Sequence, residues 1–125
     1  MYARARQSEI DVVSLNISFD VVDPNNAFLM LATFRHWIRK HPDRYTLAGT
    51  VADIEAAKAQ GKLAVVFDIE GGNAVAAHPG LVELFYRLGV RWMLLAYNKN
   101  NALGGGCLDE DPGLTAYGRQ IIDEM

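Results

Sequence analysis

The chain has 125 residues, of which 50% are hydrophobic and 22% are charged, a composition typical of a soluble globular segment of at most one domain. Its 12 basic and 15 acidic residues give a formal net charge of -3, which argues against a nucleic-acid partner or an anionic membrane surface. No run approaches the roughly 20 apolar residues that span a bilayer. The single Cys107 excludes an internal disulfide and a cysteine-built zinc site, and the cellular compartment stays open.

The first part of the chain predicts a strand followed by a long helix. Residues 12–19 alternate and are rich in β-branched side chains, which predicts a strand. Its register puts four apolar side chains on one side, namely Val13, Leu15, Ile17 and Phe19. The helix is expected to start after Asp23, a capping residue, and to end near His41, because Pro42 disfavours helical conformation in the residue before it.

A second helix and a second strand are predicted next, so the order is strand, helix, helix, strand. The segment from Thr50 to Asp53 resembles a capping box that opens the helix, and Gly61 ends it. Residues 63–69 form a short, almost wholly apolar run, which is typical of a parallel strand buried on both faces. The glycine pair after Glu70 allows a sharp turn.

The rest of the chain predicts a helix, a third strand, a loop and a last helix. His78-Pro79 suits a helix start, and Gly89 is expected to end that helix in a left-handed conformation. Residues 91–97 indicate another buried strand. The following loop, residues 98–107, is rich in asparagine and glycine, and Leu114-Thr115 opens the last helix.

Two carboxylates, Asp68 and Glu70, interrupt the end of the predicted central strand. Side chains alternate along a strand, so both point to one side, about 6.6 Å apart. Two carboxylates on a buried face need a metal, a cation or strong donors. One interpretation is a metal or acid/base site. In the other, Asp68 pairs with an arginine and Glu70 accepts hydrogen bonds from the amides of the turn, and the residues alone favour neither.

Other candidates have ordinary interpretations. Each of the three histidines, His36, His41 and His78, is expected to be a surface or capping residue, because no pair has metal-ligand spacing. The run of three glycines before Cys107 lacks the phosphate-binding patterns, and the cysteine is expected to be a simple loop thiol. Tyr97 differs, since it stands at the carboxyl end of a strand, where functional loops gather.

Three segments together resemble the membrane dipeptidase (renal dipeptidase) family of zinc metallopeptidases, as a bacterial-type member. They are Ile69-Glu70-Gly71-Gly72, the stretch from Leu84 to Trp92, and Leu94-Leu95-Ala96-Tyr97-Asn98. The likeness extends from about Val13 to the end of the chain. The Glu-Gly-Gly motif, at its distance from the Tyr-x-Leu-Gly-x-Arg segment, is its most specific part.

The resemblance implies a partial TIM-like (β/α)8 barrel of the amidohydrolase type, here with roughly three strands and their helices. It also implies a site with two zinc ions bridged by Glu70, in which a bridged water attacks the carbonyl of a dipeptide or a related small amide. Where the renal enzymes carry a substrate-binding histidine, this chain has Tyr97. The resemblance therefore implies a substrate-contacting role for Tyr97, whose phenol can donate a hydrogen bond to a carbonyl or oxyanion.

Other ligands of the family are missing from this sequence. The family's His-x-Asp pair comes before this segment and its two further histidines come after it, whereas a full barrel takes about 250 residues. We therefore expect residues 1–125 to be an incomplete single domain, an internal segment of a longer enzyme and inactive by itself. Open sheet edges would then favour self-association. Asp68, one step deeper than Glu70, is expected to have a structural partner such as an arginine.

A second hypothesis makes the chain a non-catalytic relative of the barrel enzymes. In that case it binds a small molecule or a protein partner through the loop at residues 98–107. Neither hypothesis includes nucleic acid or a membrane contact from this segment. Whether the longer protein is a homodimer stays open, as do its export and its preference for L- or D-residues.

Overall fold

The computed structural model describes residues 2–20 and 22–125. Within these residues, parallel strands β1 (Val12–Phe19), β2 (Tyr45–Leu47), β3 (Leu63–Glu70) and β4 (Val90–Leu94) form one sheet. β3 lies at its centre and pairs with β1 along one edge. Along the other edge it pairs with β2 at residues 63–65 and with β4 at residues 67–70. The predicted parallel α/β architecture is confirmed.

The predicted order of elements omitted β2 and is wrong there, because β2 separates the two helices that were expected to follow each other. This strand has three residues, too few to show an alternating pattern. Long-range backbone hydrogen bonds hold its ends: Leu63 donates to the carbonyl of Arg44, and Ala48 donates to the carbonyl of Val65, both at 2.8 Å. The structure also adds a short helix, α1 (Tyr2–Gln7), in a segment for which no element was predicted.

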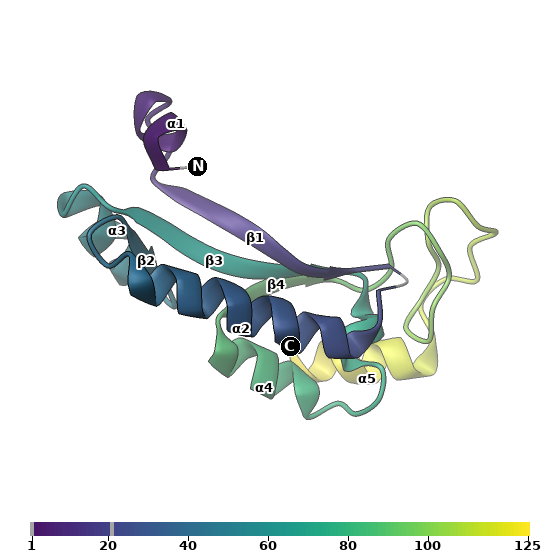
Figure 1. Cartoon of the computed structure of the whole chain (residues 1–125). Helices are drawn as coiled ribbons and strands as arrows, with labels where there is room; N and C mark the ends of the chain where they lie inside the picture. Colours follow the sequence, from purple (N-terminus) through teal and green to yellow (C-terminus); the bar gives the residue numbers. More distant parts are fainter. Residues whose placement is uncertain (1, 21) are drawn as a thin grey trace.

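Helices cover both faces of the central strand. In Figure 1, α2 (Pro24–Lys40), α4 (Leu81–Leu88) and α5 (Ala116–Glu124) lie along one face of the sheet. On that face the core is formed by buried apolar side chains of β3, α2 and α4: Leu63, Val65, Phe67, Ile69, Leu31, Ile38 and Phe85. On the opposite face, α3 (Val51–Ala59) packs Ala57 against Ala64 and Val66. β3 is therefore buried on both faces up to Ile69, as its composition predicted.

Most predicted helix ends are confirmed by their caps. The Asp23 side chain accepts a hydrogen bond from the amide of Asn25 at the start of α2, and His41 caps its end. Gly89 ends α4 with a φ of 111°, a conformation that disfavours residues with a Cβ. Thr115 caps α5. α4 itself starts at Leu81, later than predicted, and a 3-10 helix, η1 (Gly72–Val75), precedes it.

A bulge in β1 changes the side to which its last residues point. The register runs from Asn16 opposite Asp68 to Ser18 opposite Ile69, so β1 contains one extra residue. As a result, Ile17 is only 2% exposed, whereas Phe19 is 47% exposed and lies opposite Glu70. The expectation that Phe19 shares a side with Ile17 is wrong for this reason.

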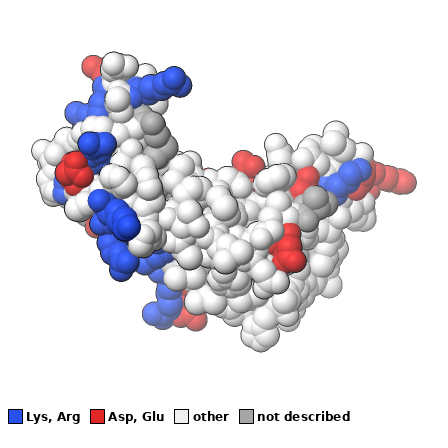
Figure 2. Space-filling model, in the orientation of Figure 1, with Lys and Arg blue, Asp and Glu red and all other residues white. Residues whose placement is uncertain are grey.

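Within the residues that the structure describes, the outer edges of the sheet are unpaired and part of one face is exposed to solvent. There, β1 and β4 each pair with β3 alone. Trp92 and Leu94, which alternate with the half-buried Met93 on β4, are 54% and 47% exposed. Figure 2 shows basic side chains gathered at the end where α1 and α3 lie, while much of the surface between the two ends is uncharged. No helix within residues 2–20 and 22–125 has the length and hydropathy required to cross a bilayer.

The capping box of α3 predicts a pH-dependent contribution to stability. Hydrogen bonds from the Gly49 amide, then from the Thr50 side chain and amide, hold the pKa of Asp53 below its ordinary value of 3.8. A lowered pKa stabilises the fold above the pKa of the unfolded chain and loses this effect as the pH falls through the folded value. Urea unfolding of Asp53→Asn should therefore show a stability deficit that is constant at neutral pH and shrinks below about pH 3.8. A deficit that does not change with pH would contradict the assignment.

The turn after β3 predicts a large effect of a single methyl group. Gly71 has a φ of 127°, and a Cβ there would lie 2.9 Å from the backbone nitrogen of Asp20. We expect Gly71→Ala to lower the free energy of unfolding by at least about 3 kcal/mol, from backbone strain and overpacking together. Gly61→Ala is the matched control, because Gly61 also has a positive φ, 68°, but open space around it, and should cost only about 1 kcal/mol. Equal losses in urea unfolding would contradict the steric argument.

Candidate functional site

The carboxyl ends of β1, β3 and β4 meet at one end of the sheet, and Glu70 lies in the middle of them. In the register, Glu70 is opposite Phe19 of β1 and Leu94 of β4. Glu70 is exposed, although the seven preceding residues of β3 are buried. In the described part of the chain, its carboxylate takes part in no ion pair and accepts no hydrogen bond. Within these residues, the carboxylate of Glu70 therefore has no protein partner.

The amides of the turn are used elsewhere. Gly71 donates to the carbonyl of Leu94 at 3.0 Å, and Gly72 donates to the carbonyl of Leu95 at 2.8 Å. These two bonds extend the pairing of β3 with β4 past the last strand residues. The interpretation in which Glu70 accepts hydrogen bonds from the turn is therefore wrong.

Asp68 has a different environment, although it lies on the same face of β3. It is 7% exposed, and its Oδ1 accepts a hydrogen bond from Asn16 Nδ2 at 3.0 Å. Its Oδ2 accepts one from the hydroxyl of Ser14. The expected structural role of Asp68 is confirmed, but among the described residues its partners are two neutral donors of β1 and not an arginine, because Asn16 lies directly opposite Asp68 in the register. Asp68 thus joins β1 to β3 through neutral hydrogen bonds.

Tyr97 lies three residues beyond β4, beside a pocket of about 530 Å³. The pocket is lined by residues from the end of β4 and from the following loop: Leu94, Ala96, Tyr97, Gly105, Gly106, Cys107, Asp109 and Asp111. Glu70 is not among its lining residues, but Leu94, its neighbour in the register, is. The structure therefore brings the two predicted site residues to the same end of the sheet, and no hydrogen bond joins their side chains in the part of the chain that the structure describes.

The asparagine and glycine loop is held by its own side chains. Asn101 accepts hydrogen bonds from the amides of Leu103 and Gly104, and donates one to the carbonyl of Leu95. Asn100 accepts one from the amide of Gly106, where a Cβ would lie 2.4 Å from the backbone of Lys99. The glycines therefore allow close packing within the loop. Amides already bonded in this way are not available to cradle a phosphate.

The histidines have the surface and capping environments that were expected. His41 Nδ1 lies 2.8 Å from the carbonyl oxygen of Trp37, and His78 Nδ1 accepts a hydrogen bond from the amide of Gly80. His36 is exposed on α2. Over residues 2–20 and 22–125, no group of three or more histidine, cysteine, aspartate or glutamate side chains is arranged to hold a metal ion.

Sequence reasoning missed Asp20, a buried carboxylate just after β1. It accepts hydrogen bonds from the side chain and amide of Asn98 and from the amide of Lys99. Burial raises the pKa of Asp20, but these hydrogen bonds outweigh it and hold the pKa below the ordinary value of 3.8. The available signal was an acidic residue at the carboxyl end of a predicted strand, the same signal that identified Glu70.

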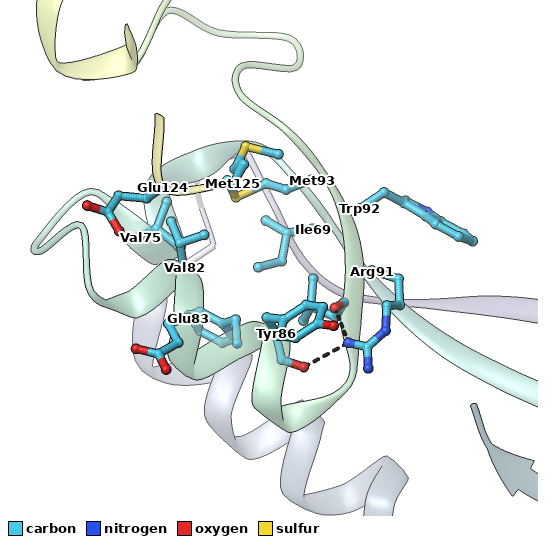
Figure 3. Close-up of a pocket in the computed structure, with 12 residues that line it drawn as sticks. Ile69, Val75, Val82, Glu83, Tyr86, Arg91, Trp92, Met93, Glu124 and Met125 are labelled. Atoms are coloured by element: carbon cyan, nitrogen blue, oxygen red, sulfur yellow. Dashed lines mark hydrogen bonds between the residues drawn. The ribbon is translucent and has the colours of Figure 1, made fainter. Parts of the chain in front are cut away.

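A second pocket, of about 220 Å³, lies on the helix side of β4 (Figure 3). Ile69, Val82 and Met93 are among its mainly apolar lining residues, and Trp92 points away from it. Arg91 borders the pocket and donates a hydrogen bond to the carbonyl of Tyr86 at 2.8 Å. This pocket lies on the face opposite Glu70 and has no part in the candidate site.

Known proteins share the sequence pattern of this chain. Residues 7–125 match the family described as Membrane dipeptidase (Peptidase family M19). Dipeptidase verJ of Clonostachys rogersoniana is 32% identical over 91 residues, which cover 70% of this chain and 24% of that protein. Dipeptidase tcpJ of Claviceps purpurea is 28% identical over 103 residues, which cover 80% of this chain and 24% of that protein. The chain thus spans about a quarter of the length of these relatives.

Solved structures agree with this match. An amidohydrolase from Pseudomonas aeruginosa superposes with a TM-score of 0.92 at 28% identity, over 99% of this chain and 38% of that chain. The probable dipeptidase PvdM from the same organism gives a TM-score of 0.85 at 17% identity, over 98% of this chain and 36% of that chain, and supports the fold alone. The expected partial TIM-like barrel of the amidohydrolase type is confirmed. With a family match over nearly its whole length, this chain belongs to the membrane dipeptidase family, peptidase family M19.

Proposed function

We propose that the full-length protein containing this chain is a metal-dependent dipeptidase that hydrolyses dipeptides or related small amides. In this proposal, residues 1–125 are an incomplete single domain of the barrel and supply Glu70 as the ligand that bridges two zinc ions. The observation that carries it is the free carboxylate of Glu70 at the carboxyl end of β3, beside a buried Asp68 whose oxygens are both hydrogen-bonded. Active sites of barrel enzymes lie at this end of their strands.

The donor set of this chain fits zinc only in part. A carboxylate oxygen is an ordinary zinc ligand, but a catalytic zinc ion takes three protein ligands, and the described residues hold no such group. Glu70 therefore fits as one ligand of a site whose other ligands come from the rest of the protein. When bound, the metal pair would supply an activated water and polarise the scissile carbonyl.

The remaining work of the site falls to residues of this chain that do not bind metal. Tyr97, 39% exposed beside its pocket, would donate its phenol proton in a hydrogen bond to the substrate carbonyl and to the oxyanion that forms from it. Phe19 and Leu94 flank Glu70 with exposed apolar side chains. They would contact apolar parts of the substrate and limit the access of bulk water.

The hypothesis of a non-catalytic binding module gains no specific support. It places binding in the loop at residues 98–107, where Asn100 and Asn101 use their amide groups within the loop and with the adjacent backbone. Asn98 is bonded to Asp20. We therefore retain the dipeptidase as the one proposed function.

Glu70→Gln in the full-length protein tests the bridging role. The amide keeps the shape of the side chain but removes its charge, so we expect bound zinc to fall below two ions per chain and kcat to fall at least about 100-fold. Zinc content is measured by elemental analysis and rate by hydrolysis of Xaa-Xaa dipeptides. Glu55→Gln, at an exposed site on α3, is the matched control and should leave both unchanged. Full zinc occupancy in Glu70→Gln would refute the bridging role.

Tyr97→Phe tests the proposed substrate contact. Removing one hydrogen-bond donor to a developing oxyanion lowers kcat by about 100- to 1,000-fold in known cases, and we expect a loss of this order with little change in KM or zinc content. Tyr86→Phe is the control, because Tyr86 is an exposed tyrosine of α4 on the other face of the sheet. A Tyr97→Phe enzyme with the kcat of the unaltered protein would mean that the ring only packs.

A further inference from the structure

Asp20 makes contacts with all three strand ends that surround the candidate site. It follows Phe19, the last residue of β1, and its own amide donates to the carbonyl of Glu70 at 2.9 Å. Asn73, in η1 after β3, donates a side-chain hydrogen bond to the carbonyl of Asp20. The Asp20 side chain reaches the loop after β4. One residue thus joins the ends of β1, β3 and β4.

The two carboxylate oxygens of Asp20 have separate roles. Oδ1 accepts hydrogen bonds from the amides of Asn98 at 2.9 Å and Lys99 at 3.3 Å, and Oδ2 accepts one from Asn98 Nδ2 at 2.7 Å. Asn98 directly follows Tyr97 in the chain. The contact therefore fixes the backbone beside Tyr97 from the opposite side of β3, across the sheet.

The hydrogen bond from the Asp20 amide to the carbonyl of Glu70 depends on unusual backbone geometry at Asp20 and Gly71. Asp20 has a φ of 37°, a left-handed conformation that aspartate tolerates better than most residues. The lack of a Cβ on Gly71 lets the turn lie against the Asp20 amide. Strained backbone of this kind persists where the surrounding structure holds it, and it is concentrated at functional sites.

We propose that Asp20 is a positioning residue, which sets the place of Tyr97 relative to Glu70 by holding Asn98. This inference rests on the proposed function, since it concerns the same site. Asp20 itself touches neither substrate nor metal in this account. Its effect is on turnover, because a reacting group displaced by about 1 Å can lose about 100-fold in rate.

The bond pattern allows a test by exchanging the two side chains. In Asp20→Asn, the one remaining oxygen cannot accept both from the two amides and from Asn98 Nδ2, so the new NH2 group faces a donor in either orientation and weakens the contact with the loop. In the double variant Asp20→Asn with Asn98→Asp, the new side-chain NH2 group at position 20 can donate to the new carboxylate at position 98. The two side chains together keep the same number of non-hydrogen atoms. A role that depends on this contact should be lost in the single variant and recovered in the double variant.

The measurements are kcat, KM and zinc content of the full-length enzyme, with amide hydrogen exchange of residues 97–99 as a readout independent of activity. For Asp20→Asn we expect kcat to fall about 10- to 100-fold with unchanged zinc content, and exchange of these amides to rise roughly tenfold. The double variant should return both values to within about threefold of the unaltered protein. Asp53→Asn, which also removes a carboxylate that accepts hydrogen bonds from the backbone, should leave both unchanged.

The outcomes separate this inference from the proposed function. Unaltered kcat and exchange in Asp20→Asn would overturn the positioning role, and so would a double variant as impaired as the single one. If the unaltered enzyme hydrolyses no dipeptide, the proposed function fails. The exchange measurement then still decides whether Asp20 fixes the backbone beside Tyr97.

Discussion

The pairing of β3 along both of its edges is the constraint on which the rest of the structure depends. Because β1 and β4 are both parallel to β3, their carboxyl ends reach the same end of the sheet as Glu70. β3 is buried up to Ile69, and Glu70 is the first residue of the strand that is exposed to solvent. The buried strand therefore presents the carboxylate of Glu70 at its exposed carboxyl end.

Asp68 and Glu70 show how environment separates two carboxylates on one face of a strand. Asp68 lies opposite Asn16 and uses its oxygens to join β1 to β3. Glu70 lies between Phe19 and Leu94, which offer no donor. The bulge in β1 contributes to this difference, since it turns Phe19 toward Glu70. Two carboxylates only two residues apart on β3 therefore differ in role. Asp68 is structural, whereas Glu70 has no protein partner within the described residues.

Local signals in the sequence predicted much of the fold. The caps at Asp23, Thr50 and Gly89, and the apolar run of β3, depend on near neighbours and could be recognised. β2, the bulge and the partners of Asp68 depend on contacts between distant segments, and no local pattern reports them. Their positions at strand ends made Glu70 and Tyr97 candidates, and the family resemblance gave them roles, whereas the role of Asp20 follows only from the spatial meeting of β1 with the loop after β4.

The central claim is that Glu70 belongs to a metal site completed by the rest of a family M19 barrel. The most direct measurement is a crystal structure of the full-length protein grown with zinc, with metal positions taken from anomalous scattering at the zinc edge. The account predicts two zinc ions, each about 2.0–2.2 Å from one of the two carboxylate oxygens of Glu70. Zinc ions bound elsewhere in the barrel, with Glu70 outside their coordination, would contradict it.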